Sequence, residues 1–469
     1  MCNNTTGSKN TAFGHRALCC NNTDGNTAVG TYALMNNRTG TSNTALGSGA
    51  LQENFTGGGN TAVGSNAMLN TNAPNNTAMG GNALCANVSG TDNAAFGDAA
   101  LKANTASGNS AFGAGALYKN TTGACNVAVG RAALEQNTIG YRNTAAGFRS
   151  LRCTTTGARN TAVGSYSLSL NTIGLGNTAI GDNTLTNNTG GGNNTAVGQA
   201  SLYKNTTGIR NVAVGVGALI CSTSGKENTS VGFSSMALNT SGCYNAAFGL
   251  YALKSNTTGC FNNAFGNLAL ISNTTGIRNV SFGHNSLSSN TTGTCHVAIG
   301  YAANSNINAN ISNTIAVGTS SATSATTGHT VWGNSSNNVC NCVYAAWSNV
   351  SDCRDKTNIK SLDSKYGLAL IKKLRPVKYN WDHRDTYVRE CKYEYGQKDG
   401  NLAGTKEHYG LIAQELKSAL DELEIKFDGL GHDDEKDAYR LTYEELIAPL
   451  IKAVQELSNR LEIVEEKVG

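Results

Sequence analysis

The chain has 469 residues, of which 55 are glycine, 3 are proline and 14% are charged. This composition excludes collagen, which needs a G-X-Y period rich in proline, and it disfavours intrinsic disorder, which needs more charge. A net charge of +4 is too small to indicate a surface that binds nucleic acid or membrane. No apolar run approaches the ~18 residues of a membrane-spanning helix. The first residues have no apolar core, so we expect no Sec-type signal peptide.

The distribution of charge divides the chain in two. Residues 1–318 contain 15 Lys and Arg and 7 Asp and Glu, a net of +8, whereas residues 319–469 contain 20 and 24, a net of −4. Two different kinds of structure are therefore joined. We predict a repeat shaft over 1–318, a connector over 319–350 and a separate globular module over 351–469.

The first part is a tandem repeat whose units are marked by a glycine. Nineteen such glycines follow one another in steps of 16 to 18, almost always 17: 14, 30, 47, 64, 80, 97, 113, 130, 147, 164, 181, 198, 215, 232, 249, 266, 283, 300 and 318. Counted from this glycine, position −4 is Asn in 17 of 19 units, position −2 is always Ala or Ser, and position −1 is always apolar. Position +4 is Leu or Met in 17 units, and most units close with Asn-Thr-Thr-Gly or a variant.

A 17-residue unit cannot bury an apolar face alone, so the units must stack on one another. The residues before each glycine predict a short strand, and the glycine permits a turn. Strands stacked ~4.8 Å apart would build a rod of roughly 86 Å. Asn above Asn predicts a ladder of amide hydrogen bonds, and the −1 and +4 columns are expected to form a thin core. The predicted fold is mostly β, a parallel β-solenoid or β-roll; a helical-repeat array is the alternative, which the short, glycine-rich unit disfavours.

The repeats contain few residues that could form a metal, cofactor or catalytic site. No C-x-x-C pair occurs, and Cys340 and Cys342 have no histidine close by, so we predict no metal site and no cofactor. Most of the other cysteines are interpreted as small buried hydrophobes. Seven acidic residues scattered over 318 positions do not predict the carboxylate pair of a glycosidase. Asn-x-Thr triplets would be glycosylation acceptors in a secreted eukaryotic protein, but their regular phase favours the structural ladder.

Beyond residue 318 the 17-residue period is expected to lapse. In the connector, Trp332, Tyr344 and Trp347 are expected to act as packing anchors. Apolar spacing then predicts a helix over 366–374 that ends before Pro376, a strand over 377–381 and a helix over 410–423.

The last segment carries a heptad. Its apolar residues are spaced alternately by four and three: Tyr443, Ile447, Leu450, Val454, Leu457, Leu461, Val464 and Val468. Thr442 and Glu445 predict a capping box, and Pro449 is expected to kink or restart the helix. The pattern indicates a coiled coil, and a helix packed on its own module is the alternative. The seam alone does not determine the number of strands.

Four segments resemble, in order, the S74 peptidases, which are the intramolecular chaperone domains of phage endosialidases and tail fibres. They are SDCRDKTNI at 351–359, LRPVKYNW at 374–381, HYGLIAQEL at 408–416 and LTYEELIAPL at 441–450. The repeats more weakly resemble the NTAxG arrays of phage and giant-virus fibres and, more loosely, the heads of trimeric adhesins.

The resemblance implies a domain that forms a homotrimer, helps the upstream shaft to fold and then cuts itself off. By matching positions, Ser351 would be the nucleophile and Lys356 its base, with cleavage of the Val350–Ser351 bond, and Arg354 would stabilise charge. A serine hydroxyl needs such a base, and lysine serves only when neutral, which requires a pKa lowered from ~10.4.

These features predict a trimeric, tailspike-like fibre protein for host attachment, assembled in the host cytoplasm and then located on the virion or outside the cell. The expected partners are further copies of the chain, a host-surface receptor such as a glycan, and other fibre or virion components. We expect no nucleic acid and no membrane insertion. A cellular surface adhesin with the same self-processing end is the alternative, and an enzyme acting on external glycans is a third, which the acid-poor repeats disfavour.

Overall fold

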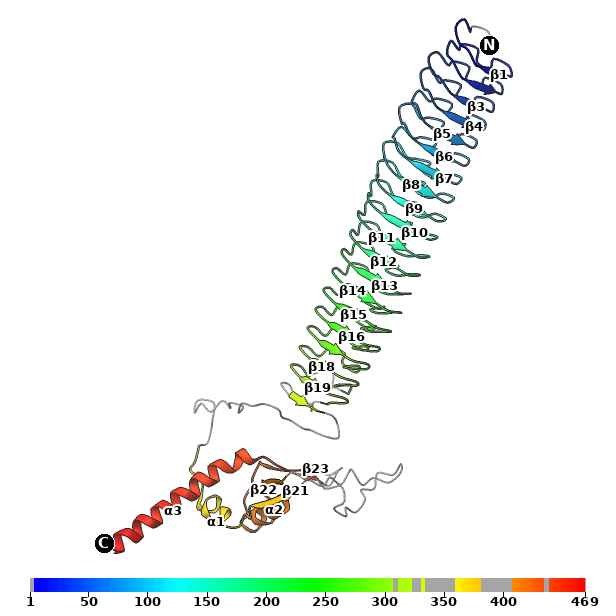
Figure 1. Ribbon diagram of the computed structural model, residues 1–469. Helices are drawn as coiled ribbons and strands as arrows, with labels where there is room; N and C mark the ends of the chain where they lie inside the picture. Colours follow the sequence, from blue (N-terminus) through cyan, green and yellow to red (C-terminus); the bar gives the residue numbers. More distant parts are fainter. Residues whose placement is uncertain are drawn as a thin grey trace, which may run out of the picture. The chain divides into compact units, whose positions relative to one another are not determined.

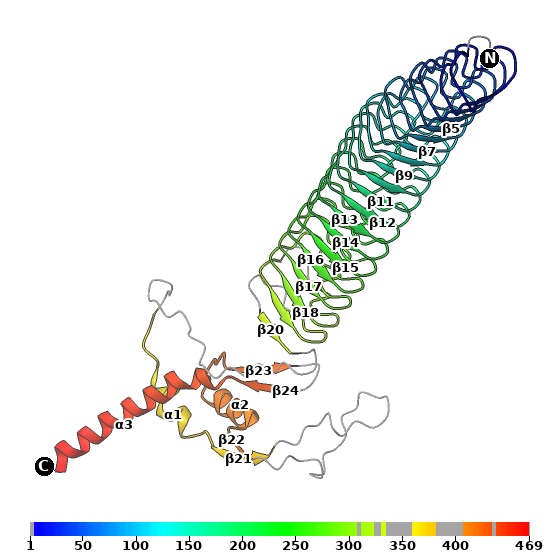
Figure 2. The ribbon, with the colours of Figure 1, turned by 45° about the horizontal axis from the view of Figure 1, so that its top comes forward.

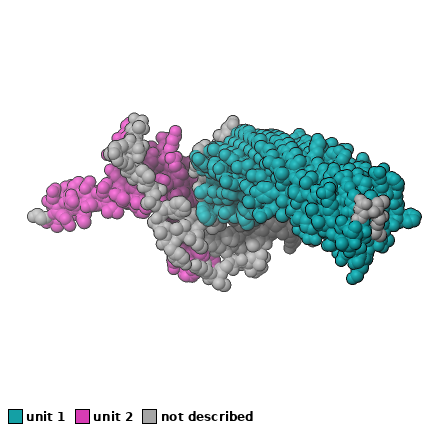
Figure 3. Space-filling model, turned by 90° about the horizontal axis from the view of Figure 1, so that it is seen from above, with its two compact units in different colours: residues 1–343 teal, residues 344–469 magenta. Residues whose placement is uncertain are grey.

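The computed structural model describes residues 4–306, 311–322, 330–333, 359–380, 407–433 and 438–468. The chain divides into two compact units, residues 1–343, here called the shaft unit, and residues 344–469, the carboxy-terminal unit (Figure 3). The predicted fold class is confirmed. The shaft unit is a parallel β-solenoid of ~17-residue repeats, and a small α/β region follows that ends in a long helix (Figures 1 and 2).

Each turn of the solenoid contributes one strand of three residues. The strands are β1 (Thr11–Phe13), β2 (Thr27–Val29), β3 (Thr44–Leu46), β4 (Thr61–Val63), β5 (Thr77–Met79), β6 (Ala94–Phe96), β7 (Ser110–Phe112), β8 (Val127–Val129), β9 (Thr144–Ala146), β10 (Thr161–Val163), β11 (Thr178–Ile180), β12 (Thr195–Val197), β13 (Val212–Val214), β14 (Thr229–Val231), β15 (Ala246–Phe248), β16 (Asn263–Phe265), β17 (Val280–Phe282), β18 (Val297–Ile299), β19 (Ile315–Val317) and β20 (Thr330–Trp332). Every strand pairs in parallel with the strand of the next turn, so that Ala162 lies opposite both Ala145 and Ala179. Equivalent positions therefore stack as columns along the whole shaft unit.

The core of the shaft unit differs from the prediction in one column. The small residues at −2 and +3 and the Leu or Met at +4 are buried, as Ala162, Ser167 and Leu168 illustrate. The −1 residues point outward, because successive side chains of a strand lie on opposite faces; Val163 is 40% exposed and Phe13 is 76% exposed. The prediction that the −1 column lines the core was wrong, and the +3 column takes its place.

The predicted asparagine ladder at position −4 is confirmed. The backbone N–H of Asn160 donates to Oδ1 of Asn143 at 3.0 Å, and its Nδ2 donates to the carbonyl of Gly174 at 2.9 Å. A second buried column, which the sequence did not predict, lies at +7: Nδ2 of Asn171 donates to the same Gly174 carbonyl at 3.2 Å. Two asparagines per turn thus donate side-chain hydrogen bonds to the backbone carbonyls of a narrow core.

Backbone geometry explains why the marker residue is glycine. Gly164 has a φ of +127°, and a Cβ added there would collide with the carbonyl oxygen of Gly181 in the next turn. The core leucines also have positive φ, 52° at Leu168. That conformation is unfavourable for a leucine, but the N–H of Leu168 is held by the carbonyl of Thr184 at 2.9 Å. The stacking of turns thus imposes a conformation that the isolated segment would not prefer.

The repeat continues past Gly318, where the sequence suggested that it lapses. Strand β20 pairs in parallel with β19, and Gly333 has a φ of 128°, as the other marker glycines do. The sequence TVWG at 330–333 fits the repeat, but its glycine follows Gly318 by only 15 residues. Trp332 is 53% exposed, so its prediction as a packing anchor was wrong. The two other predicted anchors, Tyr344 and Trp347, lie outside the described residues.

The cysteines of the shaft unit also differ from their interpretation. The nine that are described are free, and each is half-buried or exposed rather than buried: Cys19, Cys20, Cys85, Cys125, Cys153, Cys221, Cys243, Cys260 and Cys295.

The carboxy-terminal unit combines short helices with two antiparallel hairpins. Its elements are the 3₁₀ helix η2 (Ser364–Tyr366), α1 (Leu368–Ile371), β21 (Val377–Asn380), β22 (Glu407–Gly410), α2 (Ala413–Glu422), β23 (Leu430–Asp433), β24 (Ala438–Leu441), the 3₁₀ helix η4 (Tyr443–Leu446) and α3 (Ile447–Val468). Strand β21 pairs with β22, and β23 with β24. A small core of Leu370, Leu416, Ala419, Leu420 and Ile425 holds the unit together.

Three boundaries differ from those predicted. The first helix is shorter, because Gly367 separates η2 from α1. The helix predicted over 410–423 begins at Ala413, since Gly410 belongs to β22. Thr442 precedes η4, but its side chain makes no capping hydrogen bond, so the capping box was wrong. The α-helical geometry starts at Ile447, two residues before Pro449.

Candidate functional site

The first of the four resembling segments lies almost wholly outside the described residues. Val350, Ser351, Arg354 and Lys356 all fall there, so their assignment as cleavage site, nucleophile, charge stabiliser and base stays a prediction. The described chain resumes at Ile359, which is 68% exposed. The site geometry therefore comes from the other three segments.

The second and third segments meet in the hairpin of β21 and β22. Val377 pairs with Gly410 and Tyr379 with His408, and the rings of Tyr379 and His408 stack with centroids 5.9 Å apart. Pro376 precedes β21, where its missing N–H costs no ladder hydrogen bond. Segments that are 27 or more residues apart in the sequence thus become neighbours.

An ion pair joins the same two segments beside the hairpin. The guanidinium of Arg375 contacts both carboxylate oxygens of Glu415 in the first turn of α2, with Nε donating to Oε2 at 3.2 Å. The hydrogen bond from Arg375 lowers the pKa of the Glu415 carboxyl, and the same bond raises the pKa of Arg375. Both groups are solvent-exposed, so the pair adds little stability and its main effect is to orient α2.

The fourth segment reaches the hairpin through one tyrosine. The N–H of Leu411 donates to the hydroxyl oxygen of Tyr443 at 2.9 Å. Burial raises the pKa of Tyr379, and Tyr443 adds to the increase. Three of the four segments are therefore brought together, and Tyr443 is the residue that links the terminal helices to the hairpin.

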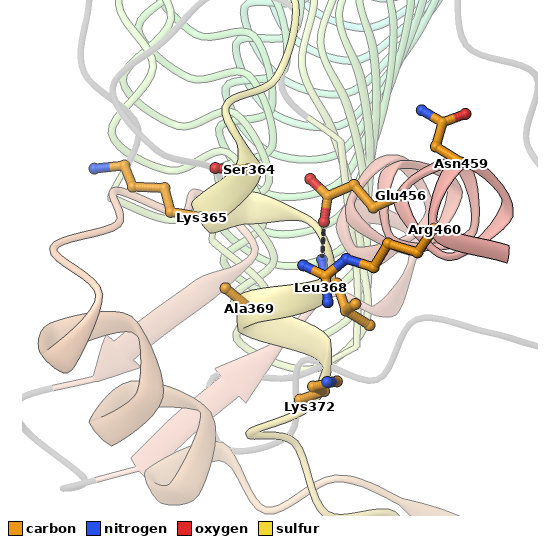
Figure 4. Close-up of a pocket in the computed structure, with 8 residues that line it drawn as sticks. All are labelled: Ser364, Lys365, Leu368, Ala369, Lys372, Glu456, Asn459 and Arg460. Carbon is orange, nitrogen blue, oxygen red and sulfur yellow. Dashed lines mark hydrogen bonds between the residues drawn. The ribbon is translucent and has the colours of Figure 1, made fainter. Parts of the chain in front are cut away.

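A polar groove lies between α1, η2 and α3. Its volume is about 550 Å³, and its described lining is Ser364, Lys365, Leu368, Ala369, Lys372, Glu456, Asn459 and Arg460 (Figure 4). Oε2 of Glu456 accepts a hydrogen bond from the N–H of Leu368 at 2.9 Å, which ties α3 to the start of α1. Lys452 lies 4.0 Å from the other carboxylate oxygen. The groove is open and polar, and we assign Glu456 a structural role there.

One face of helix α3 packs against its own unit, and another face is exposed. Pro449 and Ala453 are buried on the face that contacts α1. The heptad residues lie on a different face and are exposed; Leu457 is 50% and Leu461 is 59% exposed. The alternative prediction, in which the heptad packs on its own module, is therefore wrong for this unit. The sequence predicted this seam but not the anchoring roles of Tyr443 and Glu456. The only indication of these roles was position: Tyr443 lies within the fourth segment and Glu456 shortly after it.

The described residues of the shaft unit form no comparable cluster. A shallow mid-shaft groove of about 290 Å³ includes Arg131, Arg149 and Arg152, and Arg152 is paired with Glu135 at 2.8 Å. Within the described ranges, no three His, Cys, Asp or Glu side chains form a potential metal site. None of the helices described has the length and apolar character that a membrane span requires.

Comparison with known proteins identifies the carboxy-terminal part. Residues 351–423 match the model of the Peptidase S74 family, described as the chaperone of endosialidase. The matched range contains the first three resembling segments, and the fourth, 441–450, follows it. Comparisons with curated proteins and with solved structures give no significant match. Residues 351–423 of this chain are therefore similar to the chaperone domains of the S74 family, and the β-solenoid of the shaft unit is of the kind that fits a tail-fibre-like protein.

Proposed function

We propose that this chain is the subunit of a homotrimeric fibre that attaches a virus particle to its host. The solenoid forms the shaft, and the S74 domain guides the assembly of three copies before it is removed. The observation that supports association of the copies is the exposed heptad seam of α3, in the same unit as the S74 match; the number three rests on the resemblance to the S74 domains. A seam of seven apolar residues with half-exposed leucines is stable only when other helices cover it.

The proposed removal step is an autoproteolysis at Val350–Ser351. The Ser351 hydroxyl oxygen attacks the Val350 carbonyl carbon while the neutral amine of Lys356 accepts the hydroxyl proton. The proton passes to the Ser351 nitrogen as the peptide C–N bond breaks, which leaves an ester between Val350 and the Ser351 side chain. Water then hydrolyses the ester and releases residues 1–350. Arg354 would stabilise the negative charge that develops on the Val350 carbonyl oxygen.

Autoproteolysis would make the assembled shaft kinetically stable. The chaperone domain is needed only while the copies associate. Once it is removed, the assembled shaft cannot disassemble by the reverse of its assembly pathway. The shaft carries the host contact in this proposal, with a surface glycan as the class of receptor. A cellular adhesin remains the alternative; immunogold labelling with an antibody against the shaft distinguishes the two, because it marks either virus particles or the cell surface.

The mass of the purified chain tests the trimer. We expect sedimentation equilibrium to give three copies, and we expect Leu457→Glu combined with Leu461→Glu to weaken the association. Gln455→Glu combined with Ser458→Glu is the matched control, since it adds the same charge to exposed positions of α3 outside the seam. A wild-type chain that sediments as one copy would refute the proposal.

A further inference from the structure

The strands of the shaft unit present a continuous outward face. We call the outer face the first and third residues of strands β1–β19, which are positions −3 and −1 of the repeat. All nineteen −1 residues are apolar, and the −3 residues are Thr, Ser, Ala, Val, Ile or, once, Asn263. None of the 22 charged residues of 1–318 falls in either column. The two columns therefore form a face without charge over nineteen turns.

The outer face is exposed or half-buried along the unit. Its large side chains with the greatest exposure begin at Phe13 in β1, continue through Val163 and Ile180 in the middle, and reach Phe282 and Ile299. Aromatic rings stack within it from turn to turn: Phe248 and Phe265 lie 4.8 Å apart, and Phe265 and Phe282 5.6 Å apart. Such stacked ring pairs add packing energy along the column.

The size of the face matches a protein interface. Nineteen turns at ~4.8 Å and a width of about 10 Å give roughly 900 Å². A monomer seldom exposes an apolar patch of more than a few hundred Å², and each partner contributes about 800 Å² to a standard interface. Only the −1 column, roughly 450 Å² of this area, is uniformly apolar, since the −3 column is mostly Thr, Ser or Asn. The whole face is about as large as one side of a standard interface.

We propose that the shafts of neighbouring copies pack side by side through this outer face, parallel and in register. A stripe that repeats every turn is covered along its full length only by a partner with the same rise and the same length, which is a second copy of this chain. The copies would not be intertwined, because each core is already closed within one chain, with Leu151 and Leu168 fully buried. The inference rests on the proposed trimer and specifies how its shafts touch.

Cross-linking of the full chain tests the contact. In Val163→Cys, the new thiol lies on the outer face; in Leu170→Cys, the matched control, it lies at a position of similar exposure, 43% against 40%, outside that face. A bismaleimide whose span matches the ~10 Å between packed sheet faces should give several-fold more covalent dimer with Val163→Cys. The unsubstituted chain measures the background from its native cysteines, of which the nine described lie outside both columns.

A pair of charge variants gives an independent readout. Val163→Lys with Ile180→Lys would place charges at the contact, where they must lose water without a partner. We expect a lower thermal midpoint for the assembled chain, with an unchanged β-type circular dichroism spectrum at low temperature. Leu170→Lys with Val216→Lys, at equally exposed positions, should leave the midpoint unchanged.

The outcomes separate the inference from the proposed function. If the wild-type chain sediments as one copy, both are overturned. If it is a trimer but Val163→Cys gives no more cross-linking than Leu170→Cys, the outer face is not the contact, and the trimer stands.

Discussion

The backbone N–H of Asn160 donates to the side-chain Oδ1 of Asn143, seventeen residues earlier, at 3.0 Å. Asn177 makes the same contact with Asn160, also at 3.0 Å. Asn160 therefore accepts from the next turn while its own Nδ2 donates to the carbonyl of Gly174. Because these groups are buried, a missing partner is costly, and the ladder couples each turn to its neighbours.

Asn160→Ala should loosen the turn that follows it. The substitution removes the acceptor of the Asn177 N–H and leaves that buried donor unpaired, at a cost of about 1–3 kcal/mol. Hydrogen exchange should show faster exchange of the Asn177 amide. Asn70→Ala, at an exposed position, is the control and should leave protection unchanged. Equal protection of Asn177 in both variants would contradict the role of the ladder.

Leu151→Asp should disrupt the shaft core. Leu151 is fully buried, so the change removes a core side chain and buries an unpaired carboxylate, which together cost at least about 4 kcal/mol. We expect loss of soluble, assembled chain and a weakened β-type circular dichroism spectrum. Leu170→Asp makes the same chemical change at a 43% exposed position and should be tolerated. A soluble, fully folded Leu151→Asp chain would be inconsistent with the observed core.

The stability of the last turns should depend on pH through His296. This residue takes the place of an asparagine in the ladder, is buried, and binds Thr314 through Nδ1 at 2.7 Å. Burial lowers its pKa below the ordinary value of 6.5. The unfolded state then binds more protons than the folded state, so stability is full above about pH 7 and declines as the pH falls through 6.5.

Hydrogen exchange of the segment around 279–317 at two pH values measures this effect, after correction for the intrinsic rates. We expect lower protection at the acidic pH in the wild-type chain and a smaller difference in His296→Asn, which restores the ladder residue. His15→Asn changes an exposed histidine and should retain the wild-type response. If His296→Asn responds as the wild type does, another group is responsible.

Self-cleavage should depend on Ser351 and Lys356. The purified wild-type chain should give fragments 1–350 and 351–469, Ser351→Ala should remain full length, and Lys356→Ala should cleave ~10²–10⁴-fold more slowly, as expected for loss of a general base. Arg354→Ala should also be slower. Ser348→Ala and Lys360→Ala are matched controls that should cleave normally. Denaturing gels with mass spectrometry of the fragments measure this, and cleavage that persists in Ser351→Ala would refute the nucleophile.

The shaft should require the carboxy-terminal unit during synthesis. A chain made as 1–350 should be monomeric or aggregated, whereas the same 1–350 product released by cleavage should stay a heat-resistant trimer. The two samples have the same covalent structure and differ only in whether the carboxy-terminal unit was present during folding. A difference in their assembly is therefore kinetic. Sedimentation compares them directly; identical, soluble assemblies would show that the S74 domain is not needed for assembly.

Much of the fold follows from local pattern. The columns of Asn, Ala and Leu predicted a parallel solenoid and its ladder because identical neighbours 17 residues apart stack without regard to distant sequence. The segments that resemble the S74 family and the heptad of α3 could also be recognised from the sequence, because each is a contiguous motif. The nucleophile Ser351 and the base Lys356 were assigned on that motif alone and remain predictions.

Only the tertiary structure decided which columns face inward. Val163 and Leu168 are both apolar, and their sequence pattern does not separate them. Strand alternation sends Val163 to the outside, whereas a positive φ, sustained by the neighbouring turns, sends Leu168 to the core. In the same way, the contacts of Tyr443 with Leu411 and of Glu456 with Leu368 join residues 32 and 88 positions apart. No local propensity encodes such contacts, because they form only when separate elements pack.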